Sequence, residues 1–118
     1  MSDLTTVYGI PSCDTVRRAR RWLAEHEIEH DFHDLKKAGI DAARLEGWAA
    51  RVGWDQLLNR RGTTWRRLDE VEREGIDGAK AIGLMVAHPS LIRRPVVERG
   101  DEVLLGFDET LWTKAFGT

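Results

Sequence analysis

The sequence predicts an α/β protein in which a mixed sheet, in the order β-α-β … β-β-α, carries an inserted all-helical subdomain. First, a β-branched segment, an amphipathic helical segment and an alternating segment follow one another within about 35 residues, the size of a βαβ unit. Second, two strand-like segments flank a glycine-containing turn near the C-terminus and precede a last helical segment. Third, the residues between these two parts show mainly helical periodicity. A chain of 118 residues suits one domain of this kind.

The first part of the chain has the pattern strand, helix, strand. Residues 4–8 are β-branched and aromatic and are followed by Gly9, which predicts a short buried strand. A helix then opens near Cys13, with apolar residues along one stripe and arginines over the rest of its surface. Residues 28–35 alternate in polarity, which predicts the second strand.

The middle of the chain is expected to be helical. The segments are, in order, a helix at residues 41–52, a shorter apolar segment at 54–59, and helices at 65–72 and 77–88. Asp41 and Thr64 are the expected N-caps of the first and third segments, and Pro89 is expected to stop the last one.

The last part of the chain predicts a hairpin and a terminal helix. Residues 95–98 and 102–107 flank a turn that contains Gly100, and residues 108–116 have an apolar helical face. The whole order fits one thioredoxin-like domain, formed by residues 1–39 and 93–118, with a helical insertion at residues 40–92.

Charge and cysteine content exclude several classes of protein. The formal net charge of −2 argues against a general nucleic-acid binder, which is normally basic. Cys13 is the only cysteine, which excludes an internal disulfide and a multi-cysteine zinc site. Residues 1–4 show no secretory signal pattern, and the longest run of apolar residues and glycine, 81–87, is too short to span a membrane. We therefore expect a cytoplasmic protein without membrane contact.

Cys13 lies where a strand, a turn and a helix start meet, and this position favours a reactive thiol. Unpaired N–H groups of the first helical turn and the helix dipole stabilise an anion there, so the thiol loses its proton more readily. The amides of Asp14 and Thr15 and the charge of Arg17 are expected to support the thiolate. The alternative is a buried structural cysteine. Because the chain has no CxxC pair, a redox cycle needs an external thiol as resolving partner, such as glutathione or a thioredoxin-type protein.

Two further segments are candidates for holding an anionic ligand. Arg94 precedes Pro95 ahead of the hairpin, and a cis bond there would turn the backbone toward the thiol and bring a guanidinium to an anion. The loop with Arg60 and Arg61 adds two threonine hydroxyls just before a helix. Each has a structural alternative, a surface arginine pair in one case and a solvated turn in the other. The histidines show no metal-ligand spacing with Cys13, so no metal site is expected.

Three motifs in order, residues 8–15 (YGIPSCDT), 57–65 (LLNRRGTTW) and 88–95 (HPSLIRRP), carry a family resemblance. They resemble the arsenate reductase (ArsC) family, and within it the YffB-like branch, which is related to the Spx regulators. The resemblance implies a thioredoxin-like fold with a helical insertion, an active-site thiol at Cys13, and Arg94 before a cis Pro95. It also implies glutathione as co-substrate, since the YffB-like branch is thought to bind glutathione and act as a thiol reductase.

Three positions depart from the wider family. Arsenate reductases carry Cys-Gly-Thr-Ser-Arg-Asn after the strand, whereas Asp14 here adds a negative charge beside the thiol. The family's arginine after the Leu-Leu pair falls at Asn59. Spx regulators usually carry CxxC as a redox switch, and Val16 stands in place of the second cysteine. These differences weigh against arsenate reduction and against redox switching.

The leading interpretation is a cytoplasmic, glutathione-dependent thiol reductase with Cys13 as its nucleophile. The other residues expected at the site are, for the anionic ligand, Arg94, Arg61, Arg17 and Arg60, and, for the thiolate and the ligand backbone, Asp14, Thr15 and Pro95. No tightly bound cofactor is expected, and glutathione and glutaredoxin are the expected partners. One alternative is a glutaredoxin-coupled arsenate reductase. The alternative of another class is an Spx-like interaction protein that binds RNA polymerase.

Overall fold

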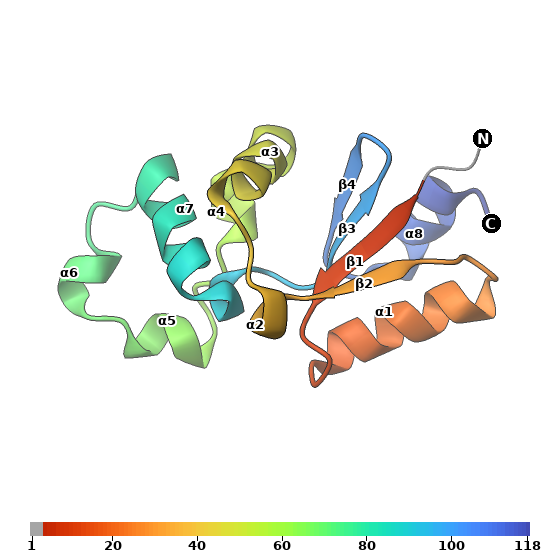
Figure 1. The fold of residues 1–118 in the computed structure, drawn as a ribbon, viewed down its shortest axis with the longest axis horizontal. Helices are drawn as coiled ribbons and strands as arrows, with labels where there is room; N and C mark the ends of the chain where they lie inside the picture. Colours follow the sequence, from red (N-terminus) through yellow and green to blue (C-terminus); the bar gives the residue numbers. More distant parts are fainter. Residues whose placement is uncertain (1–3) are drawn as a thin grey trace. The chain divides into compact units, whose positions relative to one another are not determined.

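The computed structural model describes residues 4–118, which form two compact units (Figure 1). The first unit comprises the described residues up to Asp34 together with Arg94–Thr118, and the second is Leu35–Arg93. The expectation of no secretory signal rests on residues 1–4, of which the first three lie outside the described residues. No helix within residues 4–118 is long and apolar enough to cross a bilayer.

The first unit contains a four-stranded mixed sheet in the order β2-β1-β3-β4. Its strands are β1 (Thr5–Gly9), β2 (Asp31–Asp34), β3 (Val96–Arg99) and β4 (Glu102–Leu105). β1 pairs parallel with β2 and antiparallel with β3, and β3 pairs antiparallel with β4. The predicted α/β class and thioredoxin-like mixed sheet are therefore confirmed.

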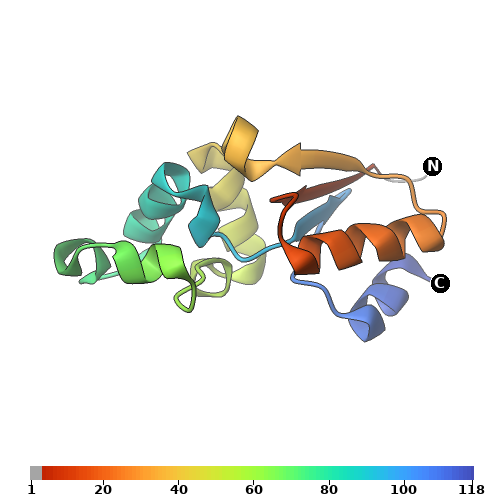
Figure 2. The same cartoon turned by 90° about the horizontal axis from the view of Figure 1, so that it is seen from below.

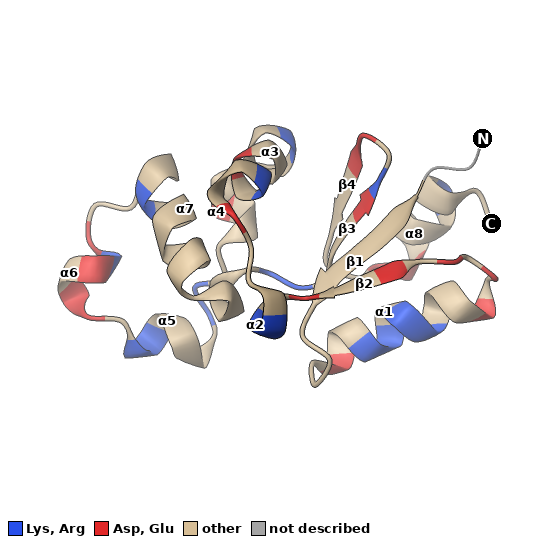
Figure 3. Ribbon diagram, viewed as in Figure 1, with Lys and Arg blue, Asp and Glu red and all other residues tan. Residues whose placement is uncertain are grey.

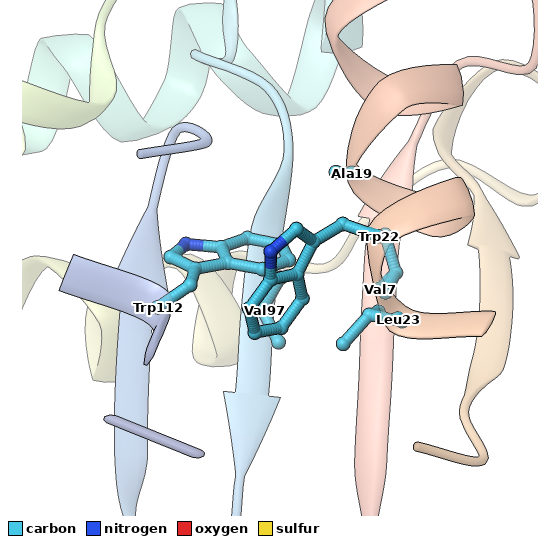
Figure 4. Packing of buried hydrophobic residues seen from close by; sticks show 6 residues of the cluster. All are labelled: Val7, Ala19, Trp22, Leu23, Val97 and Trp112. Atoms are coloured by element: carbon cyan, nitrogen blue, oxygen red, sulfur yellow. The ribbon is translucent and has the colours of Figure 1, made fainter. Parts of the chain in front are cut away.

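Two helices of this unit cover the same face of the sheet, as Figure 2 shows. They are α1 (Asp14–Glu25) and α8 (Glu109–Phe116). Between them and the sheet lies an apolar core (Figure 4), whose fully or largely buried members are Val7, Ala19, Trp22, Leu23, Val97 and Trp112. The rings of Trp22 and Trp112 meet edge to face with centroids 5.7 Å apart, a favoured aromatic geometry. This core fixes α1 against β1 and so fixes the start of α1, where Cys13 lies.

The end of α1 explains why the second strand is shorter than predicted. The N–H of Ile28 donates to the carbonyl of Leu23 over 2.9 Å, and Glu27 between them has a positive φ of 56°. This is the pattern of a Schellman helix end, in which the residue after the cap is left-handed. The prediction that the strand starts at residue 28 was therefore wrong, because residues 26–28 close the helix and β2 begins at Asp31.

The second unit is helical. Its elements are α2 (Leu35–Ala38), α3 (Ala42–Val52), α4 (Trp54–Leu57), α5 (Thr63–Arg67), α6 (Glu70–Arg73), α7 (Gly78–Ala87) and the 3₁₀ helix η1 (Pro89–Leu91). Asp41 caps α3 as predicted, because its carboxylate accepts the N–H of Arg44 over 2.7 Å. A short antiparallel bridge joins Leu58 to Ile92, with the N–H of Arg93 donating to Leu57 over 2.8 Å. This bridge brings the end of the unit back to the segment that follows α4.

The prediction of one helix over residues 65–72 capped by Thr64 was wrong. The first helix, α5, starts one residue before Thr64 and ends at Arg67, and its N-cap is Gly62. A second helix, α6, then starts after Asp69, whose N–H donates to the Glu72 carboxylate over 3.1 Å. An aspartate side chain can bond to nearby backbone groups and so favours a helix start over a position inside a helix. The apolar periodicity of this segment therefore continues across a break between two helices.

Candidate active site

A close contact between the end of β1 and α1 positions Cys13. The chain leaves β1 at Gly9, turns, and closes the turn with a 3.0 Å hydrogen bond from the Cys13 N–H to the Ile10 carbonyl. Cys13 is the extended N-cap residue of α1, and its carbonyl accepts the N–H of Arg17 over 3.0 Å. A Cβ on Gly9 would lie only 2.8 Å from a methyl of buried Val16. Glycine therefore allows the close approach of strand and helix that fixes the cysteine.

The Cys13 thiol is partly exposed and more acidic than a free thiol. Burial is the largest single influence and opposes ionisation, but it is outweighed. Hydrogen-bonding groups and charge act the other way: the amides of Val16 and Thr15, and the Arg94 side chain with its positive charge. The net result is a pKa of Cys13 below its usual value, so a larger fraction of the sulfur is thiolate at neutral pH.

The amides that act on the thiol differ in part from those predicted. Thr15 contributes as expected, but the second amide belongs to Val16 and not to Asp14. The reason is geometric, since the side chain of an N-cap residue reaches the second and third amides of the helix and not the first. Cys13 forms no capping hydrogen bond of ordinary geometry, so these amides act as nearby dipoles outside that geometry.

Arg94 reaches the same sulfur from the other end of the chain. Val96 at the start of β3 pairs with Tyr8 near the end of β1, which returns the Arg94–Pro95 segment to the end of the two central strands, where Cys13 lies. The Arg94–Pro95 peptide bond is cis, as the resemblance implies. The Arg94 side chain is half-buried and interacts with the thiol, and its buried Nε–H makes no hydrogen bond within the described part of the chain. The pair thus combines a thiolate with a guanidinium.

Arg17 and Asp14 interact with each other in the first turn of α1. Their side chains form an ion pair at the surface. The Arg17 guanidinium, by hydrogen bond and charge, and more weakly the charge of Arg18, lower the pKa of the Asp14 carboxyl. The negative charge that the sequence places beside the thiol is therefore partly balanced locally.

Arg60 and Arg61 belong to the helical unit. The Arg60 guanidinium lies 5.7 Å from the ring centroids of both Trp54 and Trp65, a cation–π arrangement. Arg61 follows an Asx-type turn, in which its N–H donates to the Asn59 side chain over 3.0 Å.

A cavity of about 390 Å³ in the helical unit gathers three arginines. It is lined by Asp55, Gln56, Leu58, Asn59, Arg60, Arg61 and Arg93. Arg93 was not among the predicted site residues. The signal in the sequence was the arginine pair before the proline, but only the backbone bridge between the two segments of this unit shows that Arg93 lines this cavity.

Comparison with known proteins assigns the chain to a family. The model of the ArsC family matches residues 8–115. The solved structure of the YffB protein is 50% identical, with a TM-score of 0.92 over 94% of this chain and 97% of that one. An arsenate reductase (ArsC) related protein from Brucella melitensis is 45% identical, with a TM-score of 0.75 over 98% of this chain and 96% of that one. A global transcriptional regulator Spx from Streptococcus pyogenes is 29% identical over 109 residues, covering 90% of this chain and 80% of that protein.

Proposed function

Since the chain belongs to the ArsC family, we propose that it is a thiol-dependent reductase in which Cys13 is the nucleophile and glutathione the co-substrate. The observation that carries the proposal is the surroundings of the sulfur. Helix amides and the Arg94 side chain together lower the pKa of a partly exposed thiol. A cytoplasmic location, where thiols stay reduced, suits this chemistry.

The proposed reaction is three successive thiol–disulfide exchanges. The Cys13 thiolate attacks one sulfur of a substrate disulfide, a Cys13–substrate disulfide forms, and the other substrate sulfur leaves as a thiolate. Glutathione thiolate then attacks the Cys13 sulfur, the substrate leaves as its second thiolate, and Cys13 carries a glutathionyl group. A second glutathione releases Cys13 and leaves as oxidised glutathione, so two glutathione thiols reduce one disulfide. An external thiol is required because Cys13 is the only cysteine.

Arg94 has a defined role in this reaction. Negative charge lies on the attacking sulfur before exchange and on the departing sulfur after it, so a fixed guanidinium beside Cys13 stabilises both. Hydrogen bonds to a charged partner are stronger than neutral ones, and arginine stays protonated throughout. The helix amides stabilise the same charge without any ionisable group.

The test measures the rate of alkylation of Cys13 by iodoacetamide against pH, together with intact mass after incubation with oxidised glutathione. We expect a midpoint below the ~8.5 of a free thiol and addition of one glutathionyl group. Arg94→Met should raise the midpoint. Arg93→Met removes the same charge from the preceding residue, which is not among the groups that act on the thiol, and should leave it unchanged. An unshifted midpoint in the wild-type protein would contradict the proposal.

Arsenate reduction is a second candidate, favoured by the 45% identity to the Brucella melitensis protein. In this reaction the Cys13 thiolate would attack arsenic, and two thiol electrons would reduce arsenate to arsenite while two glutathione molecules become one disulfide. Asn59 in place of the family's arginine and the charge of Asp14 weaken the expected oxyanion site. Arsenite formation in the presence of glutathione and glutaredoxin, absent in Cys13→Ser, would establish this activity.

A binding function in transcription is the candidate of another class, favoured by the likeness to the Streptococcus pyogenes regulator. Such a protein would bind RNA polymerase through its surface and would not need a reactive thiol. Val16 in place of a second cysteine removes the redox switch and leaves binding intact. Capture of RNA polymerase by the purified protein, equal for wild type and Cys13→Ser, would favour this function over the reductase.

A further inference from the structure

The outer face of α1 presents a row of arginines that begins beside Cys13. Arg17, Arg18 and Arg21 are all exposed, while the apolar face of α1 is buried in the core. Figure 3 shows the basic stretch of α1 in blue. Residues three or four positions apart lie on the same side of a helix, so these three side chains form one continuous surface. We call them the α1 arginine row.

Most of the charge in this row is open to a partner. Among residues 4–118, neither Arg18 nor Arg21 forms an ion pair; Arg17 pairs with Asp14, on which Arg18 acts only weakly through its charge. The fourth arginine of the helix, Arg20, turns toward the sheet, where it lies 4.2 Å from the Phe32 ring centroid and donates to a histidine. The row is therefore not a set of charges already balanced within the protein.

The row also runs against the electrostatics of its own helix. Cations near a helix N-terminus are disfavoured by the helix dipole, and like charges three or four residues apart repel each other. Arg17 and Arg21 are four residues apart, and Arg18 and Arg21 are three apart. Positions that contradict local preferences are expected at functional sites. An anionic partner bound along this face would account for the arrangement.

The geometry relates the row to the thiol. With a rise of 1.5 Å per residue, the Cα atoms of Arg18 and Arg21 lie roughly 8 and 12 Å along the helix from that of Cys13. Helical side chains lean toward the N-terminus, which brings both guanidinium groups nearer to the thiol. This span corresponds to about four residues of extended chain at ~3.3 Å each. The row therefore suits a short acidic segment better than a single small anion.

We propose that the α1 arginine row is the docking surface for an acidic segment of a partner protein whose disulfide reacts with Cys13. The inference rests on the proposed function and adds the class of substrate. Carboxylates of the segment bind Arg18 and Arg21 and hold the disulfide at the start of the helix. The Cys13 thiolate then attacks the nearer sulfur, the mixed disulfide forms, and the other sulfur leaves as a thiolate, so electrons balance without an added oxidant.

The experiment uses three synthetic peptides that differ only in the residues flanking one cysteine: glutamates, glutamines or lysines. The cysteine is supplied as a mixed disulfide with thionitrobenzoate, which leaves when Cys13 attacks, and the rate of its release is measured. We expect the wild-type protein to prefer the glutamate over the glutamine peptide by about tenfold at low salt, with the preference lost at high salt. The ratio of the two rates is independent of how much of Cys13 is ionised.

Single variants then assign the preference to the row. Arg18→Gln and Arg21→Gln should each lower the ratio, whereas Lys114→Gln, which removes one exposed charge from α8 of the same unit, should leave it unchanged. A ratio near one in the wild-type protein, or a ratio that survives both arginine variants, would overturn the inference. The inference would also be overturned if Arg18→Gln and Arg21→Gln slowed the reaction of Cys13 with oxidised glutathione as much as its reaction with the glutamate peptide, because the row would then bind a small anion. An unshifted iodoacetamide profile would instead contradict the proposed function.

Discussion

Replacing Gly9 by alanine tests how tightly the end of β1 holds the start of α1, where Cys13 lies. The new Cβ would lie 2.8 and 3.0 Å from the two methyl carbons of Val16, where carbon atoms normally stay 3.5–4.0 Å apart. Val16 is fully buried and β-branched, so it cannot rotate away within a helix. The helix start must therefore shift by roughly the missing half to one ångström.

The magnitude follows from two opposing effects. Overpacking of a core position costs about 1–3 kcal/mol, and loss of glycine freedom in the unfolded chain returns about 0.4–1 kcal/mol. We expect Gly9→Ala to lower the free energy of unfolding by about 1–2 kcal/mol in urea titrations. Because the Val16 amide is one of the groups that favour the Cys13 thiolate, the variant should also raise the pKa of Cys13 in iodoacetamide titrations.

A second substitution separates this contact from any other effect of the added methyl. Val16→Ala removes the two methyl groups that Gly9→Ala would meet, at a cost of about 1–3 kcal/mol when made alone. In the double variant the overlap is absent, so the two changes should cost about 1–2 kcal/mol less than the sum of the single changes. Strict additivity, or a Gly9→Ala protein as stable as wild type, would refute the reasoning.

Three further outcomes are expected away from the site. Glu27→Gly should raise the free energy of unfolding by about 0.5–1 kcal/mol in urea titrations, because the left-handed residue that closes α1 would then be glycine. Burial lowers the pKa of His30, whose neutral ring also accepts a hydrogen bond from Arg20. The contribution of His30 to stability is therefore present above pH ~6.5, and it is lost as the pH falls from there through the folded-state pKa. The urea midpoint of wild type should therefore fall more steeply below about pH 6.5 than that of His30→Gln. Lys80→Met should speed proteolysis of the loop before α7, since the ammonium donates to the Val71 carbonyl over 2.8 Å, whereas a Lys80→Arg control should keep much of this protection.

Local patterns account for the parts of the fold that the sequence predicts well. The β-branched run before Gly9 and the apolar stripe of the next helix differ in period, so the strand-to-helix junction and the place of Cys13 at it follow from the residues themselves. Asp41 is likewise a cap whose partner lies three residues away. The helical periodicity of residues 65–72 predicted one continuous helix, but the capping interactions of Asp69 end it and start α6.

Contacts between distant residues account for what the sequence does not predict. Arg93 and Asn59 line one cavity only because two segments of the helical unit pair through the bridge at Leu58. Neither the periodicity nor the spacing of residues in the sequence predicts that pairing. The amide of Val16, and not that of Asp14, acts on the Cys13 thiolate. This residue could have been predicted from the sequence, because an N-cap side chain reaches the second and third amides of its helix.

The acidity of Cys13 therefore has two structural origins that respond to different changes. The amide contribution is local and persists wherever the first turn of α1 is formed. The Arg94 contribution depends on the pairing of β3 with β1, because the Tyr8–Val96 register sets where the residues before β3 lie. A slip of one residue in that register would reverse the faces of β3 and carry Arg94 away from the sulfur. A change that loosens the pairing of β3 with β1 should thus remove the Arg94 contribution to the shift in the Cys13 pKa. A change that frays the first turn of α1 should instead remove the amide contribution, which Arg94→Met leaves in place.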